Sequence, residues 1–471
     1  MADPSEEHEG RSPTLTRSDL LRRGGAAAFA ISMFGGLADK ALGFYGPLKY
    51  ANRQLAGDLK ILQWAHFVPA YDKWFDNTWI KQWGEANDVN VSVDHINNAL
   101  LFATGSKEVA AQSGHDLFQF LSPPSSFQKQ VLPLNDIVQE VTKKLGKMTQ
   151  VGLRSTYNPK TKKFFGFPDN YVPDPVQYRG SLFHQLGIPV RTWENIRQAA
   201  PKLKALGHPV GLGMSNELDS NMFLISLLYC YGGFIQNEQN QIVFGSGSSR
   251  KGAIGALNLM KDIYKNGMSD EVFAWTAASN NQAFLAGRLS FALNAISIAR
   301  SAEDSGNTAL SDDTWLAPIP AGPNTRLGNE HVMGVYVIWK FAKNKAAAKK
   351  FLVDQQLAYR QHFVQSKFYN FPAWTNAVKG GFPAIRKMAA ADPHKPRGKY
   401  TVLTTIAQKY TTNVGHPGYS NAVIDEIFNR SLIPQMFAQV AQGKTSAADA
   451  VTTFDKQFKQ IHRKWQNQGL V

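Results

Sequence analysis

Cysteine is almost absent from this chain of 471 residues, and its scarcity excludes two kinds of architecture. With Cys230 as the only thiol, the chain cannot form an intramolecular disulfide or a metal site built on several cysteines. Cys230 lies in the apolar run 223–230, which indicates a small buried hydrophobic residue. A disulfide scaffold and a cysteine-held metal centre are therefore excluded.

Motifs for catalysis and for nucleic-acid binding are also missing. The sequence has no Gly-x-Ser-x-Gly elbow, no His-Glu-x-x-His, no zinc-finger spacing and no basic stripe interleaved with aromatic residues. Single, scattered histidines favour structural roles over metal ligation; they are His66, His95, His115, His331 and His416. We expect no catalytic residues, no metal, no cofactor and no nucleic-acid partner.

Positive charge is in excess but is not concentrated. The net charge is +15, from 51 basic and 36 acidic residues. The densest groups, at 143–144, 160–163 and 343–350, are short and adjoin turns or an amphipathic helix, which is typical of a solvated surface. Residues 1–43 contain five basic and six acidic residues, so the excess belongs to the rest of the chain.

The N-terminal residues 1–43 resemble an export signal. Basic residues at 17 and 22–23 precede an apolar stretch over 24–37, which is shorter than the roughly 20 residues of a spanning helix. Small-x-small cleavage sites occur at 36–38 and 41–43. The segment 16–21 is similar to a twin-arginine motif with Ser18 in place of the second arginine, which leaves the export route open. No cysteine follows, so no lipid anchor is expected there.

From residue 58 onward, strand patterns alternate with helix patterns. Strands are predicted at 59–64, 89–95, 116–121, 210–214, 289–293 and 332–339. Helices are predicted at 71–87, 106–113, 222–231, 254–267 and 345–354. The alternation predicts parallel β-α-β units, and the chain length predicts two hydrophobic cores.

Several stretches, in this order, resemble the extracellular solute-binding proteins of the maltose-binding type, the receptors of bacterial ABC importers. They are GFP at 166–168, AFLAGR at 283–288, PIPAGP at 318–323, GVYVI at 334–338, and the segments 343–352, 434–436 and 443–450. The resemblance implies an α/β fold of two lobes, each a mostly parallel sheet flanked by helices, joined by a hinge. We expect 58–170 with 336–380 in lobe 1, and 171–335 with 381–471 in lobe 2.

The resemblance further implies an extracytoplasmic or periplasmic monomer that captures a small solute by hinge closure and delivers it to membrane permease subunits. Ligands of α/β sheets lie beyond the carboxyl ends of strands, and clefts between domains are favoured pockets. A sugar needs apolar faces for its ring and amides or carboxylates for its hydroxyls. Candidate binding residues of these types are Trp64, His66, Phe67, Tyr71, Ser122, Asp169, Asn170, Tyr171, Asp219, Asn221, Trp275, Asn280, Asn294, Tyr369, Asn413, His416 and Tyr419.

Two of these positions carry alternatives. Asp219 or Ser220 serves equally well as the N-cap of the following helix. The family often places a ligand-stacking aromatic at the position of 294–297, where this chain has none, so the neighbouring Trp275 is expected to substitute.

Other functions stay open at this point. The same fold could bind a sugar phosphate or a polyamine, although the candidate cleft segments contain almost no arginine. A secreted glycan-cleaving enzyme would need two acids about 5–5.5 Å or 6.5–9.5 Å apart. Asp169 and Asp174 flank a predicted hinge segment rather than a rigid pocket wall, which favours a binding protein.

Overall fold

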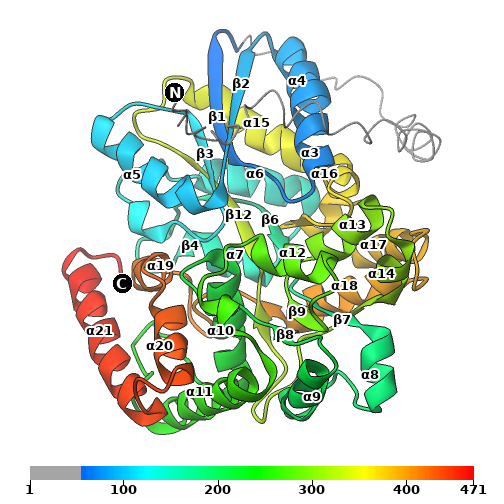
Figure 1. Cartoon of the computed structure of the whole chain (residues 1–471). Coiled ribbons are helices and arrows are strands. Elements are labelled where there is room, and N and C mark those ends of the chain that lie inside the picture. The colour runs from blue at the N-terminus through cyan, green and yellow to red at the C-terminus, as the bar shows by residue number, and fades with distance from the viewer. Residues whose placement is uncertain (1–54) are drawn as a thin grey trace, which may run out of the picture. The chain divides into compact units, whose positions relative to one another are not determined.

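The larger of the two main sheets has six strands in the order β13-β6-β12-β3-β1-β2, in a computed structural model that describes residues 55–471 (Figure 1). Its strands are β1 Asp58–Trp64, β2 Asn90–Ile96, β3 Leu117–Phe120, β6 Phe167–Val172, β12 Val332–Ile338 and β13 Phe371–Pro372. β1 pairs in parallel with β2 and β3, as the alternating pattern predicts. β12 returns antiparallel between β3 and β6, and all of its residues are buried.

The smaller sheet has four strands in the order β10-β7-β9-β8. They are β7 Val176–Arg179, β8 Val210–Gly211, β9 Phe291–Leu293 and β10 Thr314–Ala317. β8 and β9 are shorter than the strands predicted at 210–214 and 289–293. Two-residue strands form two further, separate sheets of two strands each: β4 Tyr157–Asn158 with β5 Lys163–Phe164, and β11 Gly328–Asn329 with β14 Thr411–Thr412.

Helices cover each sheet separately. Around the larger sheet lie α3 Pro69–Trp74, α4 Ile80–Asn87, α5 Leu101–Ala111, α6 Asn135–Leu145, α7 Gln150–Thr156, α15 Lys345–Leu357 and α16 Tyr359–Gln365. The helix predicted at 71–87 is interrupted by a π-helical turn over Phe75–Trp79. The helix predicted at 106–113 is α5, which begins earlier and ends at Gln112, a residue with a left-handed φ of 50°.

The second lobe contains the smaller sheet and the helices that build a hydrophobic core around it. These are α8 Gly180–Leu186, α9 Trp193–Ala205, α10 Leu218–Tyr231, α11 Gly247–Gly267, α12 Ser279–Leu285, α13 Ser297–Asp304, α14 Thr308–Asp313, α19 Ala422–Asn429, α20 Leu432–Ala441 and α21 Ala447–Asn467. Two more helices, α17 Gly381–Ala390 and α18 Val402–Thr405, pack against each other and against the 3-10 turn Lys399–Thr401. α10 is buried over residues 219–230 because α11 and α20 pack against it (Figure 1). Cys230 is buried in this helix, as the apolar run predicts.

The chain passes between the two sheets at residues 173–175, after β6, and again at 330–331, before β12. Val172 is therefore the last residue of the larger sheet before the first crossing, and Val332 is its first residue after the second crossing. The predicted lobe boundaries at 170 and 336 lie within these strands and stay predictions. The expected export signal at 1–43 lies outside the described residues. Over residues 55–471, no helix combines the length and the apolar character needed to cross a bilayer.

An aromatic cage in the first lobe surrounds His362 on α16. The ring of His362 lies 4.8 Å from Trp79, 4.9 Å from Trp74 and 5.6 Å from Tyr359, and its Nδ1 lies 3.0 Å from the hydroxyl of Tyr71. Burial among these rings disfavours the imidazolium and lowers the pKa of His362 to about 3. The cage therefore holds a neutral histidine near pH 7.

This buried histidine predicts an acid-sensitive contribution to stability. Below pH 6.5 the unfolded chain binds a proton at His362 that the folded chain excludes until about pH 3, so stability falls as the pH drops between these values. At pH 5 the loss is on the order of 2 kcal/mol. A His362→Phe variant should lose less stability than the parent between pH 7 and pH 5, measured by urea unfolding. The exposed His184, changed to Gln, is the control. Equal losses in both variants would contradict the assignment.

Candidate functional site

Four rings gather where β1 ends, and we call them the aromatic cluster: Trp64, His66, Phe67 and Tyr369. Trp64 is the last residue of β1, and its ring lies 4.6 Å from His66 and 5.4 Å from Phe67. Tyr369, which precedes β13, lies 4.8 Å from His66. Trp64, His66 and Tyr369 are buried, whereas Phe67 is half-buried. The cluster offers flat apolar faces at the carboxyl end of a parallel strand, as the sequence predicts.

The tautomer of His66 follows from its neighbours. Its Nδ1 accepts a hydrogen bond from the backbone N–H of Val68 at 2.9 Å, so the proton resides on Nε2, which donates to Asn370 Oδ1 at 3.2 Å. Burial lowers the pKa of His66 to about 4, so the ring is neutral near pH 7. His66 thus contributes a fixed, uncharged ring to the cluster.

His331 occupies the second crossing between the sheets and pairs with two carboxylates. Its Nδ1 lies 3.0 Å from Asp174 Oδ1, and its Nε2 lies 3.3 Å from Asp219 Oδ1. Burial alone would lower the pKa of His331, but the two carboxylates raise it to about 10, so His331 is a cation at neutral pH. We call these three residues the hinge triad. Scattered spacing had suggested only a structural role for His331, and nothing local in the sequence marks its partners.

A chain of amides continues from the hinge triad into the second lobe. Asp219 Oδ2 accepts a hydrogen bond from Asn280 Nδ2 at 2.9 Å. Asn294 Nδ2 then donates to Asn280 Oδ1 at 2.9 Å and to Asn281 Oδ1 at 2.7 Å. The three amides come from the start of α12 and from the residue after β9, so two elements of the second lobe converge on Asp219.

Asp219 is available for these contacts because it does not cap α10. The N-cap is Glu217, whose carboxylate accepts the backbone N–H groups of Asp219 at 2.7 Å and Ser220 at 2.5 Å. The expectation that Asp219 or Ser220 is the N-cap was therefore wrong. Burial and the neighbouring Asp219 raise the pKa of Glu217 to about 8.

Tyr369 links the aromatic cluster to the carboxylates of the hinge triad. Burial, followed by the charges of Asp219 and Asp174, raises the pKa of the Tyr369 phenol well above 10. Three buried polar atoms in this region make no hydrogen bond within the described residues: Tyr369 Oη, Asp174 Oδ2 and Asn294 Oδ1. An unsatisfied buried polar atom costs roughly 1–3 kcal/mol. These atoms therefore form a set of unused hydrogen-bonding positions near the rings of the aromatic cluster.

Four other predicted residues lie inside the first lobe. Tyr71 lies 4.8 Å from His66 but directs its hydroxyl to His362. Asp169 accepts hydrogen bonds from Gln355 at 2.6 Å and Asn170 at 2.6 Å, and burial raises its pKa to about 7. Tyr171 packs 6.0 Å from the ring of Phe371. β6 is buried on both faces, which accounts for these internal partners.

Two predicted residues lie inside the second lobe. Asn221 donates to the backbone oxygen of Glu217 at 3.2 Å, and its Nδ2 lies 3.4 Å from Ser431 Oγ. Trp275 belongs to the hydrophobic core of this lobe, and its backbone oxygen accepts the hydroxyl of Ser215 at 2.6 Å. Its expected role as a substitute stacking ring stays a prediction.

Three further predicted residues, Asn413, His416 and Tyr419, lie in the loop 413–420. Asn413 donates to the backbone oxygens of Val414 and Gly418, so it closes the loop on itself. His416 packs 5.5 Å from Tyr229, and burial lowers its pKa to about 4. The guanidinium carbon of Arg154 lies over the ring of Tyr419, 5.9 Å from the centre of the ring.

Ser122 lies beside a contact that joins the lobes. Ser122 and Pro123 adjoin the same small pocket as Ile424 and Asp425. Close by, the backbone N–H of Ser126 donates to Asp425 Oδ2 at 2.7 Å. Burial raises the pKa of Asp425 to about 7. This hydrogen bond connects the 3-10 turn Ser125–Phe127 of the first lobe to α19 of the second.

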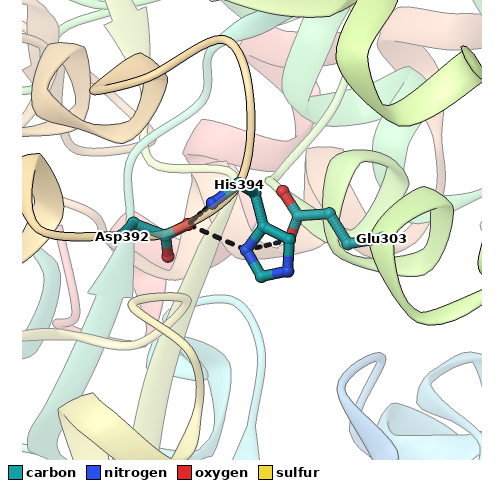
Figure 2. A group of neighbouring side chains, drawn as sticks. All are labelled: Glu303, Asp392 and His394. Atoms are coloured by element: carbon teal, nitrogen blue, oxygen red, sulfur yellow. Dashed lines mark hydrogen bonds and ion pairs between the residues drawn. The ribbon is translucent and has the colours of Figure 1, made fainter. Parts of the chain in front are cut away.

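A second group of acids and a histidine has metal-ligand residue types (Figure 2). Glu303, Asp392 and His394 bring ligand atoms within 4.8 Å of one another. However, the carboxylates already pair with cations: Arg300 lies 2.8 Å from Glu303 and 3.0 Å from Asp392, and Lys399 lies 2.8 Å from Glu303. A divalent metal here would face two buried positive charges, so the group fits an ion-pair network better than a metal site.

Comparison with known proteins agrees with this architecture. Residues 66–358 match the family model described as bacterial extracellular solute-binding protein. Maltose-bound MalE3 of T. maritima is 17% identical with a TM-score of 0.69, covering 86% of this chain and 100% of that one. A solute-binding protein of Thermotoga lettingae bound to α-D-tagatose is 15% identical, with a TM-score of 0.70 and coverages of 86% and 100%.

A third similar structure is the GacH receptor of Streptomyces glaucescens, solved unliganded and with acarbose. It is 16% identical with a TM-score of 0.69, covering 86% of this chain and 98% of that one. No curated protein matches the sequence significantly. At these identities the solved structures show the two-lobed fold, whereas the family model covers more than half of the chain. The chain therefore belongs to the bacterial extracellular solute-binding protein family.

Proposed function

We propose that this protein captures a neutral, polyhydroxylated solute, a sugar, between its aromatic cluster and its hinge triad, and delivers it to an ABC importer. The observation that carries the proposal is the presence, near the crossings between the lobes, of apolar rings together with unsatisfied carboxylate, amide and phenol atoms. Rings can stack on the C–H face of a sugar while carboxylates and amides bind its hydroxyls. Maltose, α-D-tagatose and acarbose are the ligands described for the similar structures.

The charge of the proposed site favours a neutral solute over a sugar phosphate. The hinge triad sets two carboxyl groups against a single imidazolium, so acidic groups outnumber cations there. A phosphate group would be repelled there. A polyamine is the second candidate, because the same negative charge and the neighbouring rings would attract an ammonium group.

The mechanism follows from the position of the triad. His331 and Asp174 lie in the two crossings, and Asp219 begins α10 of the second lobe, so closing the lobes brings ring-bearing and acid-bearing surfaces together. A solute that contacts both surfaces stabilises the closed form. We further propose that the protein acts as an exported monomer without catalytic activity, and that the permease recognises the closed form.

A thermal-shift screen of the purified chain tests the proposal, with sugars, polyols, sugar phosphates and polyamines as probes. A solute at 100 times its dissociation constant stabilises the folded state by about 2.7 kcal/mol. A selective rise in melting temperature with one sugar class would support the proposal. A rise with polyamines alone would replace it by the second candidate, and a rise with sugar phosphates alone would overturn the charge argument.

Trp64 should contribute strongly to binding of the sugar that the screen identifies. Trp64→Ala is expected to weaken binding by about 2 kcal/mol, or about 30-fold, because it removes the largest ring of the cluster. Trp64→Phe should bind with intermediate affinity. Both are measured by calorimetric titration at a temperature where circular dichroism shows a folded chain. Trp315→Ala is the matched control, because Trp315 is 44% exposed on β10. Parent-like affinity in Trp64→Ala would remove the aromatic cluster from the site.

A further inference from the structure

Two consecutive residues between α16 and β13, Lys367 and Phe368, have a left-handed backbone, with φ angles of 53° and 69°. Among residues 55–471 they are the only adjacent pair of non-glycine residues with a positive φ. Crowding of the Cβ atom disfavours this conformation, most of all for a bulky side chain such as that of Phe368. We call this pair the left-handed turn. Backbone strain of this kind persists only where surrounding contacts enforce it, so the turn needs partners.

The end of α16 accounts for one of the two residues. The backbone N–H of Lys367 donates to the backbone oxygen of Val364 at 2.9 Å, and that of Phe368 donates to Phe363 at 3.0 Å. This is the hydrogen-bond pattern of a Schellman motif, and the rings of Phe363 and Phe368 stack 5.1 Å apart. Lys367 therefore occupies the position at which such helix ends usually have glycine. The motif does not account for a second left-handed residue at Phe368.

The helix α13 of the second lobe contacts this turn through two side chains. Arg300 donates from Nε and Nη2 to the backbone oxygen of Lys367, at 3.1 Å and 3.0 Å, and its guanidinium carbon lies 5.5 Å from the ring centre of Phe368. Asp304, the last residue of α13, binds the ammonium group of Lys367 at 2.6 Å and 2.8 Å. Arg300 is buried, whereas Asp304 lies at the surface. Both residues of the turn are thus held from the other lobe.

The left-handed turn is continuous with the proposed solute site. Tyr369 of the aromatic cluster follows the turn directly, and the next residue, Asn370, accepts the hydrogen bond from His66 Nε2 at 3.2 Å. α13 also contacts the site from the second lobe, because its first residue, Ser297, accepts a hydrogen bond from the amide of Asn281 at 3.0 Å. The direction of Tyr369 and Asn370 therefore depends on a turn whose partners belong to the second lobe.

We propose that Arg300 and Asp304 are positioning residues of the solute site, which hold the left-handed turn so that Tyr369 keeps its place in the aromatic cluster and Asn370 keeps its hydrogen bond. This inference rests on the proposed function, because it assigns a role in the site proposed there. Each residue acts through the backbone of the turn rather than by contact with the solute. Since the turn belongs to the first lobe and α13 to the second, the arrangement of the cluster is coupled to the contact between the lobes.

Backbone hydrogen exchange, measured without solute, tests whether α13 holds the turn. Asp304→Asn removes the charge that binds Lys367, and exchange of the peptide 366–372 should become about threefold faster. Asp136→Asn is the matched control, because Asp136 binds Lys349 at 2.5 Å. The side chains of the control pair are 58% and 30% exposed, close to the 56% and 30% of the pair at the turn. Faster exchange of this peptide in both variants, or in neither, would overturn the proposal.

Titration calorimetry with maltose, α-D-tagatose and acarbose tests the effect on solute binding. Arg300→Lys keeps the positive charge but cannot give one carbonyl two hydrogen bonds from a rigid fork. We expect an apparent dissociation constant about tenfold higher, because the binding arrangement is then populated for only a fraction of the time. Adding Lys367→Gly should return the constant to within about threefold of the parent value, because glycine adopts a left-handed φ without support. Arg288→Lys, at an exposed ion pair, is the control and should bind like the parent.

The two measurements separate this inference from the proposed function. Binding of none of the three sugars by the parent would count against the proposed function, and the exchange rates would still decide whether α13 holds the turn. Parent-like affinity in Arg300→Lys, or a loss that Lys367→Gly does not reverse, would overturn the positioning role even where a sugar binds. Titrations are made at a temperature at which circular dichroism shows a folded chain, so unfolding of a variant cannot imitate a loss of affinity.

Discussion

Replacing His331 with glutamine is expected to destabilise the folded chain by about 3–5 kcal/mol, measured by urea unfolding at pH 7. The substitution removes the only cation between Asp174 and Asp219, and the two carboxylates then lie buried with like charges. Glutamine can still donate one hydrogen bond but carries no charge. A double variant with Asp174→Asn should recover part of the loss, because it removes one of the two unpaired charges.

The pH dependence distinguishes the charge of His331 from its packing. Because the folded-state pKa of about 10 exceeds the unfolded value of 6.5, the imidazolium contributes stability that is fully present below pH 6.5 and is lost as the pH rises towards 10. The parent should therefore lose stability between pH 7 and pH 9.5, and His331→Gln should lose less over that interval. Equal slopes in the two proteins, or a His331→Gln variant as stable as the parent, would show that His331 is not charged in the fold.

The fold could be predicted largely from local patterns. Alternating or continuously apolar runs identify β1, β2, β3 and β12, because strand burial leaves a direct mark on the sequence. The short strands β7, β8 and β9 leave a weaker mark, since two to four residues contain too little periodicity. The π-helical turn at Phe75–Trp79 was not predictable, because it accompanies the packing of α3 and of the Trp79 ring against the distant helix α16.

The candidate site likewise contains some residues that local patterns could place and others whose partners are distant in the sequence. Trp64, His66 and Phe67 could be placed because they directly follow a recognisable parallel strand, and Asn294 because it follows β9. Asp169 sits at a predicted crossover, yet its partners Gln355 and Gln356 come from a helix far along the chain. Asp174 and His331 are 157 residues apart, so their pairing exists only in three dimensions. Contacts between residues far apart in the sequence decide where a side chain at a crossing points. The local sequence pattern therefore does not predict that direction.

The second of the two largest expected effects concerns Arg300, a cation beside the acids Glu303 and Asp392. Arg300 on α13 pairs with Glu303 and Asp392, donates to the backbone oxygen of Lys367 from Nε at 3.1 Å and Nη2 at 3.0 Å, and lies 3.7 Å above the ring of Tyr400. Its side chain is 3% exposed. Burial would raise the pKa of Asp392, but His394 and Arg300 lower it to about 2, so this carboxylate is charged at any pH above that value.

Arg300→Met is expected to cost about 3–5 kcal/mol, because methionine fills a similar volume but removes a buried cation that pairs with both Asp392 and Glu303. Arg288→Met is the matched control: Arg288 pairs with Glu271, but both side chains are 56% exposed, and an exposed ion pair contributes about 0–1 kcal/mol. Urea unfolding of the two variants at pH 7 compares the same chemical change at a buried and an exposed ion pair. Arg300→Met should also weaken the link between α13 and Lys367, which joins the two lobes. A loss in Arg300→Met no larger than in Arg288→Met would mean that Lys399 and His394 neutralise the acids without Arg300.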